Sequence, residues 1–317
     1  MATAPDSEAD STADTGSKPP FLRRVRIRGY KSIAFCDVAL EPLTILVGRN
    51  ASGKSNFLDA LGFLRDVVNH GLHEAIKSHG GHDAILCRFS SATAVTIEVD
   101  GLIRASSREP GTWALRSGDL WTVSYGLEMA LSSERYPRIV KEHMRLQRLD
   151  GERWTSYTVE AGHVTWKGDT HSHPIVNWAN SEKVVLGMYQ GEGPFAELFD
   201  HISAITTYNF NPEIIRRPQK PNRGLFLERD GSNLASAIDA TGEVSEATTE
   251  RISRYLMAVT NSAEFAGTGT VGGYEVLRFR TQRRDGTSAN FDATSMSDGT
   301  LRVFAALAAA FQNVPPH

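Results

Sequence analysis

Eight consecutive residues have the types and the spacing needed to hold a polyphosphate. Residues 48–55 read Gly-Arg-Asn-Ala-Ser-Gly-Lys-Ser and satisfy the pattern G-x-x-x-x-G-K-[ST]. In such a loop, backbone N–H groups point at phosphate oxygens, and a helix start adds partial positive charge at the same place. Lys54 would bring a point charge to the β- and γ-phosphates, and the Ser55 hydroxyl would be a ligand of Mg²⁺. The alternative is an ordinary glycine turn capped by Ser52 or Ser55.

The elements expected on both sides of this loop favour phosphate binding. Residues 43–47 form a nearly continuous apolar run, which is typical of a buried, central strand. After the loop, large apolar residues recur at helical spacing, at Phe57, Leu61, Leu64 and Val68. The order strand, glycine-containing loop, helix predicts a nucleotide site made of Gly48, Arg49, Asn50, Ala51, Ser52, Gly53, Lys54, Ser55 and Asn56.

A second candidate phosphate contact lies near the other end of the chain. Residues 296–302 read Met-Ser-Asp-Gly-Thr-Leu-Arg and stand immediately before a predicted helix. At that helix start, Ser297 offers a hydroxyl and Gly299 offers an unhindered N–H group. Alone, the pattern is as typical of a simple Ser/Asp helix cap. Beside the first loop, it becomes a candidate part of the same nucleotide chemistry.

The elements that must position these two segments predict a mixed α/β protein. Period-two patterns predict strands over 21–28 and 33–40, and short β-rich runs predict an antiparallel meander. The meander consists of runs at 94–99, 121–129, 139–146 and 154–159. Helices are expected near 195–202, from Asn233, over 246–259 and over 301–312, with a hairpin between Leu277 and Phe291.

Composition narrows the class of protein. The 317 residues include 34 Lys+Arg and 37 Asp+Glu, so the net charge of -3 leaves no global footprint for nucleic acid or an anionic membrane. Cys36 and Cys87 alone make no disulfide framework, which fits a reducing cytoplasm. Residues 1–20 predict a disordered tail, and the longest apolar run, 303–311, is too short for a bilayer. We expect a cytoplasmic protein without a membrane segment.

The sequence resembles the ABC-type ATPase heads of the RecF, structural-maintenance-of-chromosomes and OLD group, including predicted prokaryotic "AAA family ATPases". The resemblance covers nearly everything after residue 20. It rests on Ile-Arg-Gly-Tyr-Lys-Ser-Ile at 27–33, the loop and helix start at 48–61, Asp-Gly-Ser-Asn-Leu at 230–234, and Ser-Asp-Gly-Thr-Leu-Arg at 297–302. Ala51 stands where many relatives have glycine, and its small side chain should still allow backbone approach.

In this family two heads sandwich two ATP molecules, and the signature of one head caps the γ-phosphate on the other head's P-loop. The resemblance therefore implies an ATP-dependent homodimer with ATP and Mg²⁺ as cofactors. It also implies catalytic roles for Lys54 and, in trans, for Ser297 and Gly299. The implied process is DNA maintenance or anti-phage defence, with DNA or a partner protein as candidate partners.

The resemblance also implies a fold and a departure from it. We expect an α/β P-loop NTPase of ABC-ATPase type, with an antiparallel meander and an inserted mixed lobe. The family continues from the signature helix into an apolar strand that ends in catalytic acidic residues, whereas this sequence stops at Pro-Pro-His, residues 315–317. We therefore expect a head truncated before that strand, which binds nucleotide better than it hydrolyses it. The expected divisions are a tail (1–20), the P-loop part of the head (21–100), the meander and inserted lobe (101–290), and the signature with its helix (291–317).

Other readings stay open. The head could be a nucleotide-gated regulatory or interaction subunit that never hydrolyses ATP. A small-molecule kinase would not need the signature, and a GTPase would need Asn-Lys-x-Asp, although no Asn is followed by Lys here. The run at 95–100 is a weak internal candidate for the missing acidic strand.

Several clusters of polar residues have both a functional and an ordinary interpretation. Four histidines near Cys87 suggest zinc, but the glycines among them favour polar loop residues. A basic segment at 216–223 and a basic strip on the first strand could contact phosphates of ATP or DNA, and each is also typical of solvated surface. The residues are His70, His73, His79 and His82; Arg216, Arg217, Lys220 and Arg223; and Arg24, Arg26 and Arg28. The pair His171 and His173 is a weaker metal candidate.

Overall fold

The computed structural model describes residues 21–89, 93–104, 119–131, 136–168, 178, 180–188, 193–222, 226–282 and 287–312. The chain divides into two compact units, Met1–Ile205 and Thr206–His317, and each contains its own hydrophobic core. The domain divisions expected from the sequence, at residues 100 and 290, stay predictions. The expected tail, 1–20, lies outside the described residues. No helix in the described ranges is both long and apolar enough to cross a membrane.

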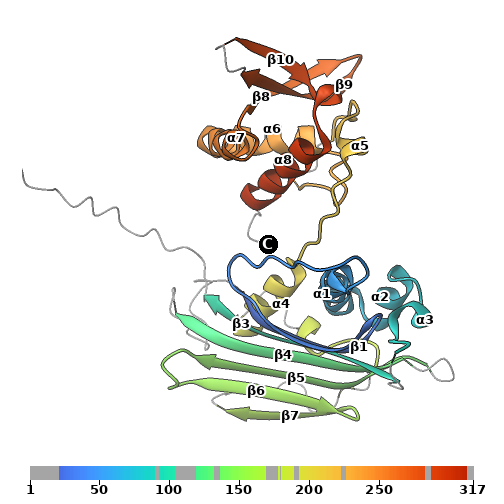
Figure 1. The fold of residues 1–317 in the computed structure, drawn as a ribbon. Helices are drawn as coiled ribbons and strands as arrows, with labels where there is room; N and C mark the ends of the chain where they lie inside the picture. The colour runs from blue at the N-terminus through green and yellow to red at the C-terminus, as the bar shows by residue number, and fades with distance from the viewer. Residues whose placement is uncertain are drawn as a thin grey trace, which may run out of the picture. The chain divides into compact units, whose positions relative to one another are not determined.

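A seven-stranded antiparallel sheet is the frame of the first unit (Figure 1). Its strand order is β2-β1-β3-β4-β5-β6-β7, so the run from β3 onward is a simple meander, as the sequence predicts. The strands are β1 (Leu22–Tyr30), β2 (Ile33–Ala39), β3 (Ala94–Arg104), β4 (Leu120–Ala130), β5 (Arg138–Arg148), β6 (Trp154–Glu160) and β7 (His163–Gly168).

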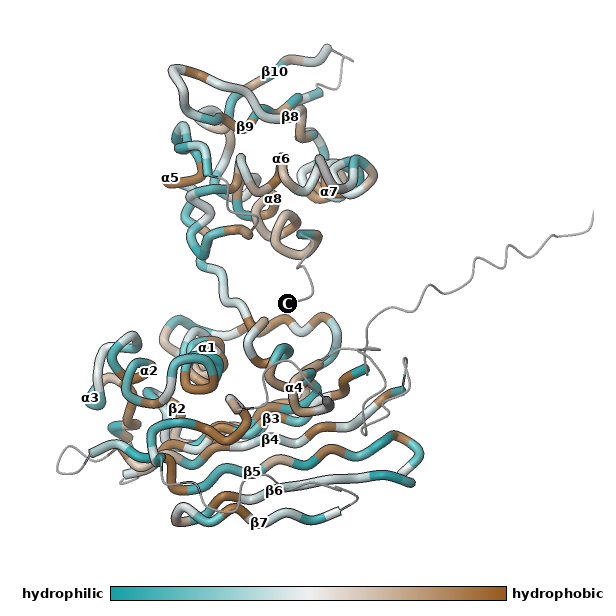
Figure 2. Tube along the Cα trace, turned by 180° about the vertical axis from the view of Figure 1, so that it is seen from behind, coloured by the Kyte–Doolittle hydropathy of each residue, from teal (hydrophilic) through white to brown (hydrophobic). Residues whose placement is uncertain are grey.

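Helices cover one face of this sheet (Figure 1). Hydrophobic and hydrophilic residues alternate along the strands (Figure 2), so one face is apolar and is buried under the helices. In β3, the side chains of Val95, Ile97 and Val99 are buried, while those of Thr96 and Glu98 point to the opposite face. The buried row packs with helix residues in one core. The covering elements are α1 (Lys54–His70), α2 (Leu72–Ser78), α3 (His82–Ile85), a 3₁₀ turn (Leu186–Met188) and α4 (Gly193–Ser203).

The expected central strand at 43–47 is wrong for this structure. The segment is neither helix nor strand, and the side chains of Leu43, Ile45 and Val47 are 79%, 73% and 85% exposed. A central strand needs a hydrogen-bonded neighbour on each side. The strands of the described residues belong to two antiparallel sheets, and the register of neither includes this segment. The apolar run therefore leads as exposed chain from β2 to residues 48–55, the candidate phosphate loop.

The second unit packs three longer helices against one face of a three-stranded antiparallel sheet of order β10-β9-β8 (Figure 1). Phe265, Phe279 and Phe304 form its aromatic centre, with ring centroids 4.8–6.0 Å apart. The predicted helices and the pairing of the predicted hairpin are confirmed. Its elements are α5 (Pro212–Ile215), α6 (Leu234–Val244), α7 (Glu246–Thr260), β8 (Ala263–Val271), β9 (Tyr274–Gln282), β10 (Ser288–Asp292), a 3₁₀ turn (Ala293–Ser295) and α8 (Asp298–Phe311).

Candidate functional site

The phosphate loop turns directly into α1 at Gly53. Gly53 has φ 94°, in the left-handed region that favours glycine, and the helix begins at Lys54. A Cβ at position 48 would lie 3.0 Å from Ser52 Oγ, so glycine there keeps the loop tight. Ala51 carries φ 64°, which strains a residue with a Cβ. The resulting cradle at a helix N-terminus fits a bound phosphate.

The Lys54 ammonium closes this loop from inside. Its Nζ donates to the carbonyl oxygens of Gly48 at 2.8 Å and Arg49 at 2.7 Å, and it lies 3.2 Å from Ser52 Oγ. The loop is therefore shaped around a positive charge that a polyphosphate could share. Ser55 is exposed on the first turn of α1, where its hydroxyl could reach a cation on the bound phosphates.

The turn between β1 and β2 holds the start of α1 in place. Tyr30 Oη donates to Asp59 Oδ2 at 2.5 Å, and Lys31 Nζ lies 2.5 Å from the same oxygen. Asn56 Nδ2 donates to Ser32 Oγ at 2.7 Å, one helical turn closer to the loop. The Gly-Tyr-Lys-Ser segment thus contributes to the site by orienting the loop's helix, a role that the sequence analysis did not assign.

A partly buried histidine extends this anchor along α1. His79, which follows the last residue of α2, lies 2.9 Å from Asp66 Oδ2 through Nε2 and 3.3 Å from Asp59 Oδ1 through Nδ1. Burial opposes a charge on the imidazole, but the bonds to both carboxylates outweigh burial and raise the pKa of His79. Burial likewise opposes charge on Asp59, yet its bonds to His79, Lys31 and Tyr30 keep its pKa well below the usual range.

These contacts bear on the zinc hypothesis. His79 is held by two carboxylates that belong to the α1 anchor, and Cys87 is a buried free thiol. Within the described ranges, no group of His, Cys, Asp and Glu side chains is arranged to hold a metal ion. His171 and His173 lie outside the described residues.

The signature segment forms the N-terminus of α8. Ser297 is the cap residue, and its Oγ accepts a hydrogen bond from Thr300 N at 3.2 Å. Asp298 and Gly299 occupy the first turn, with the Asp298 side chain 64% exposed. Ser297 and Gly299 therefore lie together at a helix start, as predicted, in the second unit. The phosphate loop belongs to the first unit.

Arg216 contacts this signature turn. It is therefore not one of the solvated cations of the basic segment at 216–223. Its guanidinium donates to Met296 O at 3.2 Å and pairs with Asp298 Oδ1 at 2.5 Å. Arg217 and Lys220 are exposed, and Arg223 lies outside the described residues.

The Asp-Gly-Ser-Asn-Leu segment at 230–234 has a structural role at the start of α6, because buried hydrogen bonds hold it to neighbouring segments. Asn233 is 2% exposed; its side chain accepts from Glu228 N at 2.7 Å and donates to Phe226 O at 2.8 Å. Gln219, which the sequence analysis missed, donates to Gly231 O and accepts from Ala235 N, both at 2.9 Å. Its side chain therefore ties the segment after α5 to α6. A lone glutamine in a polar stretch carries no signal that would have revealed this.

The basic strip on β1 is largely neutralised by neighbouring strands. Arg24 pairs with Asp37 at 2.6 Å, and Arg26 pairs with both Glu98 and Asp100 at 2.7 Å. These two residues are also the acidic residues of the 95–100 run, the internal candidate for the acidic strand that the family resemblance implies. Because both bind Arg26 on the sheet face opposite the buried row, they do not face α1.

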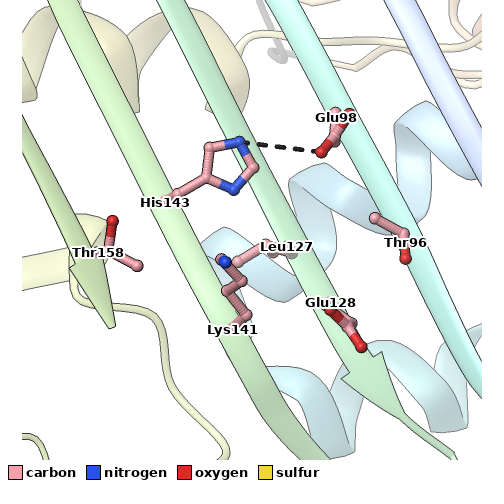
Figure 3. A pocket seen from close by; sticks show the side chains of 7 residues that line it. All are labelled: Thr96, Glu98, Leu127, Glu128, Lys141, His143 and Thr158. Atoms are coloured by element: carbon pink, nitrogen blue, oxygen red, sulfur yellow. Dashed lines mark ion pairs between the residues drawn. The ribbon is translucent and has the colours of Figure 1, made fainter. Parts of the chain in front are cut away.

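A hollow of about 460 Å³ lies farther along the same sheet face (Figure 3). There His143 points across β4 towards Glu98, with Nε2 3.9 Å from Oε1. Gly126 leaves room for the ring, since a Cβ there would come within 2.3 Å of it. Burial lowers the pKa of His143, so the imidazole adds little positive charge. The hollow is lined by Thr96, Glu98, Leu127, Glu128, Lys141, His143 and Thr158.

The loop at 48–55 has the sequence pattern and the helix-start position of a P-loop, and a comparison with a protein family agrees with this class. Residues 43–108 match the family described as "AAA domain, putative AbiEii toxin, Type IV TA system". Over this stretch the chain is similar to an AAA domain family, which agrees with the resemblance drawn from the sequence.

A curated relative narrows the comparison. Over 76 residues the chain is 33% identical to "DNA replication and repair protein RecF" of Arthrobacter sp. (strain FB24). The aligned stretch is 24% of this chain and 17% of the relative, so the chain spans less than a fifth of that protein's length.

Proposed function

We propose that this chain is the ATP-binding head of an ABC-type ATPase of the RecF-like group. The observation that carries the proposal is the loop at 48–55, which closes around the Lys54 ammonium at the N-terminus of α1. On binding, the ammonium would exchange loop carbonyl oxygens for phosphate oxygens. Ser55 would hold Mg²⁺, which supplies neutralising charge to the phosphates when bound.

The second half of the proposed site is the signature turn. Ser297 and Gly299 would approach the γ-phosphate bound to the P-loop of a second copy, so ATP would join two heads into a homodimer. The support is the capped N-terminus of α8, where a small residue and a hydroxyl lie at the positive end of the helix dipole. Hydrolysis would then proceed at the dimer interface by positioning and electrostatic stabilisation.

Nucleotide affinity tests the first half of this proposal. Lys54→Ala removes the charge-assisted contacts, worth about 1.5–3 kcal/mol, and should weaken Mg·ATP binding by about 10- to 100-fold. Lys77→Ala is the matched control, because the Lys77 side chain is 74% exposed on α2. Titration of a fluorescent ATP analogue gives the affinities, and circular dichroism checks folding. Equal affinity in folded wild type and Lys54→Ala would contradict the assignment.

A second candidate function is a nucleotide-gated regulatory subunit. It is favoured by the state of Glu98 and Asp100, the acidic residues of the 95–100 run, which are committed to Arg26. Such a subunit would associate on binding ATP without turnover. Phosphate release measured beside light scattering distinguishes the two functions: turnover that is lost in Ser297→Ala supports the ATPase, and association without turnover supports the regulator.

The process served is part of the same proposal. The similarity to a DNA replication and repair protein favours DNA maintenance, and the family description, a putative toxin, leaves anti-phage defence as the other process. The neutralised strip at Arg24 and Arg26 makes that surface a poor phosphate contact. Stimulation of turnover by double-stranded DNA would support DNA maintenance.

A further inference from the structure

Arg216 connects two segments that are far apart in the sequence. It follows α5, and its guanidinium contacts Glu213 on that short helix, the Met296 carbonyl oxygen at 3.2 Å and the Asp298 carboxylate at 2.5 Å. The side chain is 22% exposed. The two contacts to residues 296 and 298 lie on either side of Ser297, the residue that caps α8.

The backbone that carries Arg216 is fixed. Asn211 caps α5 by accepting from Glu213 N at 3.0 Å, and Pro212 occupies the start of the helix. Ile215 is 1% exposed in the same core as Leu301 of α8. The guanidinium therefore projects from a rigid base onto the signature turn, and it can hold that turn in one orientation.

The contact also has an electrostatic consequence. Asp298 stabilises the positive end of α8 but places a negative charge beside the spot where a phosphate would approach. Arg216 neutralises this charge, and its hydrogen bond to Asp298 raises the pKa of the guanidinium further. Without Arg216, the carboxylate would repel an incoming phosphate, and Met296 O would lose a donor.

We propose that Arg216 is a positioning residue that holds the signature turn and neutralises Asp298, and so sets how tightly the turn engages the γ-phosphate on a second copy. This inference rests on the proposed ATP-dependent homodimer. It assigns a role to one cation of the 216–223 segment that differs from direct contact with phosphate.

The test compares two adjacent arginines in the full chain. Arg216→Gln should weaken self-association in Mg·ATPγS by about tenfold or more, while the affinity of the P-loop for nucleotide stays unchanged. Arg217→Gln is the control, since Arg217 is exposed next to it, and should associate like wild type. Sedimentation velocity gives the association constants, and a fluorescent ATP analogue gives the nucleotide affinity. Asp298→Asn added to Arg216→Gln should recover part of the lost association, because the uncompensated charge is removed.

A second readout does not depend on dimerisation. Amide hydrogen exchange over 297–301 should speed up in Arg216→Gln without nucleotide, stay slow in Arg217→Gln, and return partway in Arg216→Lys, which keeps the charge. Equal association and equal exchange in Arg216→Gln and Arg217→Gln would overturn the inference alone. Absence of ATP-driven association in wild type would instead overturn the proposed homodimer, and this inference with it.

Discussion

Lys54 and Arg216 each bind main-chain carbonyl oxygen in one of the two candidate segments. Lys54 binds the Gly48 and Arg49 oxygens of its own loop, whereas Arg216 reaches from the end of α5 to the Met296 oxygen beside the signature, so each turn is shaped before any ligand arrives. A preformed turn loses less conformational entropy on binding than a flexible one. Tyr30 and Glu142 act elsewhere in the first unit through side-chain hydrogen bonds, and their effects should appear in stability.

Tyr30→Phe should destabilise the first unit. The phenol is fully buried, and the substitution removes its bond to the charged Asp59 carboxylate while leaving the ring in place. Hydrogen bonds to charged groups contribute about 1.5–3 kcal/mol, so the free energy of unfolding should fall by about that amount. Urea denaturation followed by tryptophan fluorescence measures it. Tyr136→Phe, at an 81% exposed site, should change nothing, and equal losses in both variants would refute the explanation.

Glu142→Gln should lower the free energy of unfolding by more than Tyr30→Phe does. Its carboxylate, 1% exposed, accepts from Tyr125 Oη, Tyr157 Oη, and the backbone N–H groups of residues 185 and 186 at 2.6–3.1 Å. Burial raises the pKa of Glu142 and these donors oppose the rise. An amide would turn an N–H group towards one of the donors, a loss of about 2–4 kcal/mol in unfolding free energy. Glu128→Gln, on the outer face of the sheet, is the control for charge alone; a loss as large there would rule out this explanation.

At the scale of elements, α1 is the helix on which the phosphate loop depends. The segment between β1 and β2 holds the first turns of α1 by contacts to Asp59 and Asn56. His79, the residue after α2, also holds this helix. Around the His79 ring lie Asp59 and Asp66 of α1, with the ring of Phe63 5.2 Å away. Lys31 and Arg65 bind the same two carboxylates from the other side. These ion pairs tie the residue after α2 to α1, the helix that carries the loop at its N-terminus.

The free energy of unfolding should carry the pH signature of His79. Its folded-state pKa is raised above the ordinary value of 6.5, so its contribution is complete below pH 6.5 and is lost as pH rises through the folded-state pKa. His79→Gln should lower stability by about 1–3 kcal/mol at pH 6, and the gap to wild type should narrow by pH 9. Denaturation at several pH values measures this gap. A gap independent of pH would mean that the charge of His79 contributes nothing.

Among the described residues, two separate hydrophobic cores form, one in each compact unit. One core joins the seven-stranded sheet to α1, α2 and α4, and the other joins the three-stranded sheet to α6, α7 and α8. The phosphate loop belongs to the first unit and the signature turn to the second. A large-to-small substitution of a side chain in one core should therefore lower the stability of the unit that contains that core.

Calorimetry of the full chain should show this separation. Phe63→Ala and Phe279→Ala each remove a fully buried ring, at a cost of about 3–5 kcal/mol, from the first and second core respectively. Each variant should lower the midpoint of one thermal transition and leave the other in place. A single transition that moves equally in both variants would contradict the independence of the two cores.

The local features of this protein follow from its sequence alone. Short β-rich runs located strands β3 to β6 of the meander, apolar residues at helical spacing located α1, and the glycines and Lys54 located the candidate phosphate loop. These features depend on side-chain alternation and turn chemistry, which are properties of adjacent residues. Ser297 as the cap of α8 follows from the same local rules.

The pairing of residues that are distant in the sequence depends on the tertiary fold. The apolar run at 43–47 looks like a central strand, but strand formation needs a pairing partner, and the structure leaves the run exposed. Arg26, His79 and Arg216 each look like solvated or ligating residues in the sequence, and each is bound to carboxylates that the fold brings from other elements. Long-range pairing has no local signature, because it depends on the path of the chain between the partners.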